Sequence, residues 1–81
     1  MLITLYTKPE CSLCDDVLDV IKQVRARIEF DLEIRNILDD LADYEKYKHD
    51  IPVILLDGQE IARHHLTEAA LEFALSSRRL Q

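Results

Sequence analysis

The chain has 81 residues, and its 16 acidic side chains outnumber the 10 basic ones to give a formal net charge of −6. That length fits one small domain over residues 1–81, and the negative charge disfavours nucleic acid as a partner, because phosphate binding requires a basic face. No apolar run reaches the ~20 residues of a membrane span, and the N-terminus has neither the basic segment nor the cleavage site of a signal peptide. With only two cysteines, these features favour the reducing cytoplasm over export.

The first predicted elements are a strand and a helix, joined by a short loop. Residues 2–6 are almost continuously apolar, which is typical of a central strand covered on both faces. Over residues 12–27, apolar side chains recur every three or four positions, as on one face of a helix. Acidic side chains fall early in this helix and basic ones late, which complements the helix dipole. The apolar positions are Cys14, Val17, Leu18, Ile21, Val24 and Ile28.

The segment Cys11-Ser12-Leu13-Cys14 lies where this strand ends and the helix begins, a placement typical of a dithiol redox site. The free N–H groups and positive dipole end of a helix start stabilise a thiolate. We therefore expect an exposed Cys11 whose pKa lies below the free-thiol value of about 8.5, although nearby acidic side chains keep it from the extreme values of strong oxidants. Cys14 lies almost one turn further on and deeper, where it could resolve a mixed disulfide formed by Cys11.

A second strand and a second helix follow. Residues 29–35 alternate between apolar and charged side chains, which predicts a half-exposed edge strand. The strand–helix–strand spacing predicts that this strand runs parallel to the first. A helix over residues 39–48 would begin at Asp39 or Asp40. Its weak apolar stripe is formed by Leu38, Leu41 and Tyr44.

The last part of the sequence predicts a hairpin and a final helix. Residues 52–56 and 59–62 are two strands joined by Asp57-Gly58, a pair that suits a turn with positive φ at both residues. The final helix begins near Thr67, a suitable N-cap. Its expected buried face consists of Leu66, Ala69, Ala70, Phe73 and Ala74. The predicted order is β-α-β-α-β-β-α, an α/β fold with a mixed four-stranded sheet and flanking helices.

This order, with the cysteine pair between the first strand and helix, resembles a glutaredoxin, a small protein with the thioredoxin-like fold. Tyr6-Thr7-Lys8 followed by Cys11-Ser12-Leu13-Cys14 is similar to the family's opening, Y-[ST]-K-x-x-C-x-x-C. Ile51-Pro52-Val53 stands where the family carries a cis proline. The resemblance covers essentially the whole chain.

The resemblance implies a thiol–disulfide oxidoreductase in which Cys11 attacks a disulfide and Cys14 resolves the mixed disulfide. Lys8 would lie beside the thiolate and meet a carboxylate of glutathione. Pro52 would face the cysteines, and the backbone of Ile51 would pair with a substrate in the manner of a strand.

Two further residues are candidate substrate contacts. Leu13 lies between the cysteines at the helix tip, where it could remain exposed as an apolar lip for a partner. Thr67 belongs to residues 63–68, which stand in the place of the family's G-G-x-[DN] segment for glutathione. Thr67 lies near the position of the acid, and Glu68 could substitute for it.

Other functions stay open. The chain could be a thioredoxin-fold binding module without catalysis, or the cysteines could hold a metal or a cluster. A tetrahedral zinc site would need His64 and His65 as well, and adjacent imidazoles at a strand end point to opposite sides. We expect no bound metal or organic cofactor, with glutathione as a candidate reductant. The expected partner is a protein or small-molecule disulfide, and the expected state is a monomer.

Overall fold

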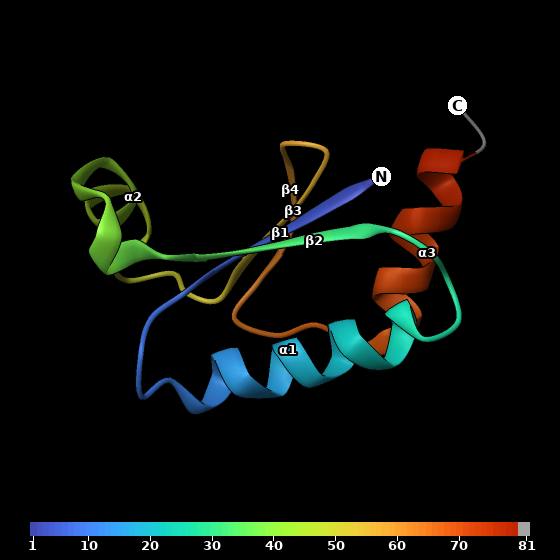
Figure 1. Ribbon diagram of the computed structural model, residues 1–81, viewed down its shortest axis with the longest axis horizontal. Helices are drawn as coiled ribbons and strands as arrows, with labels where there is room; N and C mark the ends of the chain where they lie inside the picture. The colour runs from blue at the N-terminus through green and yellow to red at the C-terminus, as the bar shows by residue number, and fades with distance from the viewer. Residues whose placement is uncertain (80–81) are drawn as a thin grey trace.

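The computed structural model describes residues 1–79, and its element order is the predicted one (Figure 1). The strands are β1 (Leu2–Thr7), β2 (Asp31–Asn36), β3 (Val53–Leu56) and β4 (Gln59–Arg63). The helices are α1 (Ser12–Arg25), α2 (Leu41–Tyr47) and α3 (Glu68–Arg79), with a 3-10 turn, η1 (Ile37–Asp39), before α2. The predicted α/β fold with a mixed four-stranded sheet is therefore confirmed.

The sheet has the strand order β2-β1-β3-β4. β1 pairs in parallel with β2 and antiparallel with β3, which in turn pairs antiparallel with β4. The predictions of a central first strand and an edge second strand are thus confirmed. Because β3 runs against β1, the start of β3 lies beside the end of β1, where the chain leaves for the cysteines.

One face of the sheet is covered by α1 and α3, which contact each other below and beside the strands (Figure 1). Side chains of β1 and β3 that point to this face are fully buried against the apolar stripe of α1. The cluster contains Ile3, Leu5, Val17, Ile21, Val24, Phe30, Ile54, Leu56, Leu66, Leu71 and Leu75. This core fixes where α1 begins relative to the end of β1.

The other face carries a smaller cluster beneath α2. Ile37, Tyr47 and Val53 are buried there, and Tyr6 packs against them. The rings of Tyr6 and Tyr47 lie 4.4 Å apart, between centroids. Tyr47 therefore anchors α2 at the sheet end from which β1 leads to the cysteines.

The predicted apolar stripe of the second helix is wrong. Leu38, Leu41 and Tyr44 are 57%, 76% and 38% exposed. Asp40 has extended backbone angles (φ −144°, ψ 121°) and separates η1 from α2, so Leu38 does not belong to the same helix as the other two. The short α2 then packs through Tyr47 in its last turn.

The predicted buried face of the last helix is only partly right: Leu66 is buried and Ala74 packs against the core, whereas Ala69, Ala70 and Phe73 are exposed. Leu71 and Leu75 are buried, whereas Phe73 is 75% exposed. The two leucines are four residues apart and fill the core with larger side chains than the alanines offer. The small side chains and Phe73 instead line an open groove of about 620 Å³ beside β4. Its lining includes Leu56, Ile61, Ala69, Ala70, Phe73 and Ala74.

The hairpin turn is confirmed in detail. Asp57 and Gly58 have φ values of 50° and 86°, the left-handed angles that this turn requires. Asp57 also accepts a hydrogen bond of 2.8 Å from the N–H of Leu2 and pairs with Arg78. These contacts hold the pKa of Asp57 below its ordinary value, with the Leu2 N–H as the largest cause.

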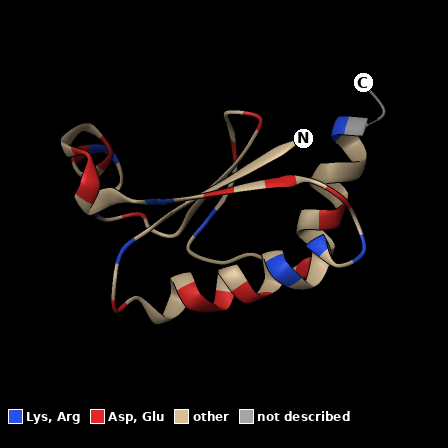
Figure 2. Ribbon diagram, viewed as in Figure 1, with Lys and Arg blue, Asp and Glu red and all other residues tan. Residues whose placement is uncertain are grey.

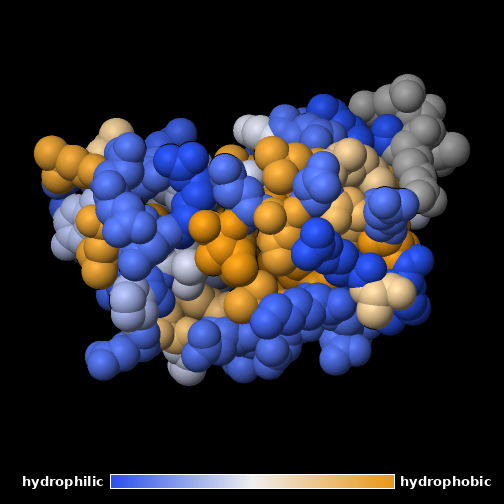
Figure 3. Space-filling view, in the orientation of Figure 1, coloured by the Kyte–Doolittle hydropathy of each residue, from blue (hydrophilic) through white to orange (hydrophobic). Residues whose placement is uncertain are grey.

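Side chains along the edge strand β2 are only partly covered. Ile34 is 50% exposed, and Leu32 packs at the margin of the core. Figure 3 shows apolar side chains in a band along this side of the sheet, above the hydrophilic outer surface of α1. None of the helices within residues 1–79 combines the length and apolar character needed to cross a bilayer.

Candidate redox site

The first turn of α1 is built on Cys11. This residue is the N-cap, with extended backbone angles (φ −116°, ψ 102°), and its Sγ accepts the N–H of Cys14 at 3.2 Å. Its carbonyl accepts the N–H of Asp15 at 3.1 Å, which starts the helical hydrogen bonding. Glu10, with φ of 60°, turns the chain into the helix. The sulfur of Cys11 therefore lies among N–H groups at the positive end of the helix dipole.

The two cysteines differ in their exposure. Cys14 is 2% exposed, whereas Cys11 is partly open to solvent. The two residues form a disulfide, with Cα atoms 5.2 Å apart. An accessible sulfur is thus joined to a buried one, the relative depth that the sequence predicts; their roles in exchange stay predictions.

Ile51 and Pro52 lie at the same end of the sheet as the cysteine loop. Val53 pairs with Tyr6, so the residues just before β3 lie beside the end of β1. The Ile51–Pro52 peptide bond is cis, as the resemblance implies, and Pro52 is fully buried. Ile51 takes part in no backbone hydrogen bond within residues 1–79, and its pairing with a substrate stays a prediction.

Lys8 lies in the loop before Cys11, and Leu13 lies in the first turn of α1. Both side chains are exposed, Leu13 by 40%, as expected for an apolar lip at the helix tip. No ion pair to Lys8 is present in the described part of the chain. Figure 2 shows acidic residues along the first half of α1, so the charge near the start of this helix is mainly negative. Contacts of Lys8 and Leu13 with a substrate stay predictions.

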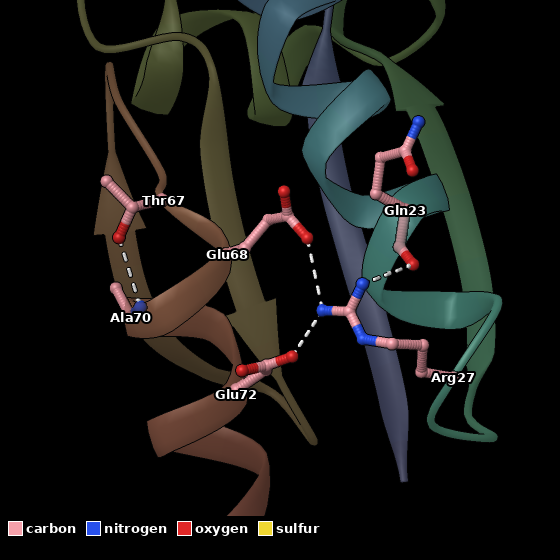
Figure 4. A network of polar contacts seen from close by, with 6 residues as sticks. All are labelled: Gln23, Arg27, Thr67, Glu68, Ala70 and Glu72. Atoms are coloured by element: carbon pink, nitrogen blue, oxygen red, sulfur yellow. Dashed lines mark hydrogen bonds and ion pairs between the residues drawn. The ribbon is translucent and has the colours of Figure 1, made fainter.

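Thr67 serves the start of α3. Its Oγ1 accepts the N–H of Ala70 at 3.0 Å, the N-cap contact that the sequence predicts (Figure 4). The following residue, Glu68, pairs with Arg27 at 3.1 Å, and Arg27 also binds Glu72. The oxygens expected to meet glutathione are thus already engaged within the chain.

A tyrosine–arginine group borders the site on the α2 side. The guanidinium of Arg35 lies 5.8 Å from the centre of the Tyr6 ring and binds Asp43 at 3.2 Å. Burial, and then the charge of Asp43, raise the pKa of Tyr6 above its ordinary value. Tyr6 therefore remains a neutral packing residue against α2 at physiological pH.

Sequence reasoning missed the contacts between Asp50 and the end of β4. Asp50 Oδ1 lies 3.3 Å from Arg63 Nη1 and 3.9 Å from His64 Nε2. The N–H of His64 donates to the carbonyl of Pro52 at 2.7 Å. Asp50 and Arg63 carry opposite charges just outside the two predicted hairpin strands, which was a signal for this contact. The register of the two strands, which decides whether the side chains meet, does not follow from the sequence.

No three His, Cys, Asp or Glu side chains come together as metal ligands within residues 1–79. His64 has φ of 71° and lies against Asp50. His65 is exposed, with its N–H bonded to the carbonyl of Arg63 at 2.8 Å. The two histidines are therefore residues of the loop after β4.

Solved structures share this fold. The crystal structure of protein XcR50 from X. campestris has a TM-score of 0.76 at 28% identity, covering 93% of this chain and 96% of that one. Protein Ne2328 from Nitrosomonas europaea gives 0.75 at 19% identity, covering 89% and 87%. Thioredoxin 1 from Thermosipho africanus gives 0.65 at 19% identity, covering 98% and 99%. The fold is thus thioredoxin-like.

The family model described as a glutaredoxin-like domain (DUF836) matches residues 2–76. This match spans the cysteine loop, the cis proline and the hairpin, the same features on which the resemblance to glutaredoxins rests. The chain therefore belongs to the glutaredoxin-like (DUF836) family.

Proposed function

We propose that this protein is a thiol–disulfide oxidoreductase that uses Cys11 and Cys14 as a dithiol pair. The observation that carries the proposal is the sulfur of Cys11 at the N-cap of α1, bonded to the N–H of Cys14 and partly open to solvent. A thiolate in this position is stabilised by the helix start and remains accessible to a disulfide. The burial of Cys14 directly behind it suits a resolving thiol.

The exchange has two steps. The Cys11 thiolate attacks one sulfur of the substrate disulfide, so that the substrate S–S bond breaks and one substrate thiolate leaves. The Cys14 thiol then loses its proton and attacks Cys11 Sγ, which releases the second substrate thiol. The protein ends with a Cys11–Cys14 disulfide, and two electrons have passed to the substrate.

The surroundings of the cysteines supply the proposed binding contacts. Lys8 would stabilise negative charge at the attacking sulfur, and Leu13 would contact apolar side chains of a partner. The main chain of Ile51, next to the buried Pro52, would pair with an extended substrate segment. These contacts favour a peptide or protein disulfide, because a main-chain partner is then available.

Glutathione is a candidate reductant rather than the favoured substrate. Thr67 Oγ1 accepts the N–H of Ala70, and Glu68 Oε1 binds Arg27, so a glutathione terminus would compete with contacts that these groups already make within the chain. Acidic residues along the first half of α1 would also repel a doubly carboxylated tripeptide. Electrons would reach the oxidised pair from an external dithiol or from two thiol molecules.

A single-turnover reaction tests the proposal. Reduced protein is mixed with a disulfide of an uncharged peptide, and released peptide thiol is followed together with the mass of the protein. We expect two peptide thiols per chain and a protein lighter by the two protons of a new disulfide. The alternative is a binding module. In that case the unsubstituted protein would not be oxidised by the peptide disulfide, and the Cys11→Ser variant would bind the peptide as tightly as the unsubstituted protein does.

A further inference from the structure

We propose that Asp50, Arg63 and His64 are positioning residues that hold the main chain of Ile51 for substrate pairing. This inference rests on the proposed function, because Ile51 is there the residue that pairs with the substrate. None of the three residues contacts the cysteines in the proposed exchange. Their effect would reach the reaction only through the position of Ile51.

The first contact fixes the residue before Ile51. Asp50 Oδ1 lies 3.3 Å from Arg63 Nη1, and the N–H of Asp50 donates to the carbonyl of Tyr47 at 2.9 Å. The side chain is thereby tied to β4, and the main chain to the end of α2. Ile51 follows a residue that is held on both sides.

The second contact fixes the residue after Ile51. The carbonyl of Pro52 accepts the N–H of His64 at 2.7 Å. His64 has φ of 71°, a left-handed angle that is unfavourable for a residue with a side chain. His64 Nε2 also lies 3.9 Å from Asp50 Oδ1. The same residue therefore reaches both neighbours of Ile51, and its unusual backbone angle is held in place by these contacts.

Arg63 is itself fixed in direction. Its Nε and Nη2 donate to both carboxylate oxygens of Glu60, at 2.8 and 2.7 Å, which leaves Nη1 to meet Asp50. These bonds to Glu60, together with the charge of Asp50, raise the pKa of Arg63. The backbone of Arg63 is also set, since it pairs with Val53 in the sheet. The group thus connects β4 to the segment before β3.

This arrangement predicts an effect on binding rather than on chemistry. The group holds the residues on either side of Ile51, whose own main chain makes no backbone hydrogen bond within residues 1–79. Loosening it should weaken pairing with a peptide, while the sulfur of Cys11 keeps its place at the start of α1. A disulfide without a peptide main chain should therefore be unaffected.

The test compares two disulfides in the single-turnover reaction. One is the symmetric disulfide of an uncharged hexapeptide, and the other is hydroxyethyl disulfide, which has no peptide backbone. For Asp50→Ala we expect half-saturation by the peptide to require about threefold more substrate, with the maximal rate unchanged. We expect a shift of only about threefold because an exposed ion pair contributes little free energy. The rate with hydroxyethyl disulfide should stay at the unsubstituted value.

Glu45→Ala is the matched control, because it removes an exposed carboxylate of α2 that pairs with Lys48, the residue after this helix. It should leave both reactions unchanged. Asp50→Asn keeps the shape of the side chain and should show a smaller shift than Asp50→Ala, which covers the case that the alanine variant folds poorly. In the double variant Asp50→Ala/Arg63→Ala, the loss of peptide-binding free energy should be smaller than the sum of the losses in the two single variants.

The outcomes separate the two proposals. If the unsubstituted protein reduces neither disulfide, the proposed function fails, and this inference fails with it. If it reduces both, but Asp50→Ala leaves peptide saturation unchanged or slows both disulfides equally, the positioning role is overturned while the function stands. Full additivity of the Asp50 and Arg63 substitutions would also overturn it.

Discussion

The helices α1 and α2 begin with the same backbone geometry but with different capping side chains. Asp40 has extended angles and its Oδ1 accepts the N–H groups of Ala42 and Asp43, at 2.8 and 3.1 Å. Cys11 also has extended angles, and its Sγ accepts one N–H, that of Cys14, at 3.2 Å. Asp is among the preferred N-cap residues, whereas Cys is not. The N-cap of α1 is thus a potential nucleophile, although residues such as Asp or Ser would stabilise the helix start more strongly.

This difference separates a structural helix start from a reactive one. The carboxylate of Asp40 accepts two N–H groups and so stabilises the start of α2, and it has no part in the proposed exchange. The sulfur of Cys11 meets the same N–H groups, and they stabilise its thiolate for attack. Substitutions at the two caps should therefore affect different quantities, activity at one and stability at the other.

The largest expected effect is that of Cys11→Ser, which should abolish disulfide exchange. Serine is a good N-cap, so α1 should remain, and the free energy of unfolding should differ from that of the reduced unsubstituted protein by no more than about 1 kcal/mol. Peptide thiol release measures the first expectation and urea unfolding the second. Retained exchange in this variant would contradict the assignment of the nucleophile.

Cys14→Ser should stop the reaction after its first step. The Cys11 thiolate would still form a mixed disulfide, but no second thiol would release the peptide. Mass spectrometry should find one peptide bound per chain and one peptide thiol in solution. A full yield of two thiols would show that Cys14 is not needed for resolution.

The pKa of reduced Cys11 should lie below the free-thiol value of about 8.5, because its sulfur lies at the helix start. Thiolate absorbance against pH in the Cys14→Ser variant measures it directly. The attack rate should rise with pH up to this pKa and then level off. A value at or above about 8.5 would mean that the cap position gives the thiolate no advantage.

Asp40→Ala should have the converse effect of Cys11→Ser. It removes the cap of α2 and should lower the free energy of unfolding by about 1 kcal/mol, while leaving the exchange rate unchanged. Asp39→Ala is the control, since Asp39 lies in η1 and caps no helix of the described chain. Equal losses of stability in the two variants would show that the Asp40 contacts do not stabilise the fold.

The smallest expected effect concerns a second carboxylate that accepts a backbone N–H, that of Asp57. The pKa of Asp57 is lowered from 3.8, so its contribution is present above that pH and is lost as the pH falls through the lower, folded-state value. Asp57→Asn keeps the turn, because Asn tolerates positive φ. The stability difference between the two proteins should narrow below about pH 4 in urea titrations. A difference that stays constant to pH 2.5 would contradict this linkage.

The fold was largely predictable because its local signals agree with one another. The stripe of α1, the alternation in β2 and the Asp57-Gly58 turn each predicted one element, and each element formed. The redox pair was predictable for the same reason, since a strand end and a helix start bracket Cys11 and Cys14. Boundaries differed slightly: α1 ends at Arg25 rather than at residue 27, and β2 covers Asp31–Asn36 rather than residues 29–35.

The failures concern side chains whose environment depends on distant elements. Phe73 was expected inside, but Leu71 and Leu75 occupy the space between α3 and the sheet. Helical spacing alone could not choose between these two faces, since both carry apolar residues. The contact of Asp50 with Arg63 depends on the β3–β4 register, including its irregularity at Ile54/Leu55, which no local pattern predicts.

The most direct test of the central claim is a brief reaction of the fully reduced protein with iodoacetamide near pH 6.5, followed by peptide mapping. The account predicts alkylation at Cys11 alone, because its sulfur is partly exposed at the positive end of α1 and Cys14 is 2% exposed. Modification of Cys14 first, or equal slow modification of both, would contradict the account.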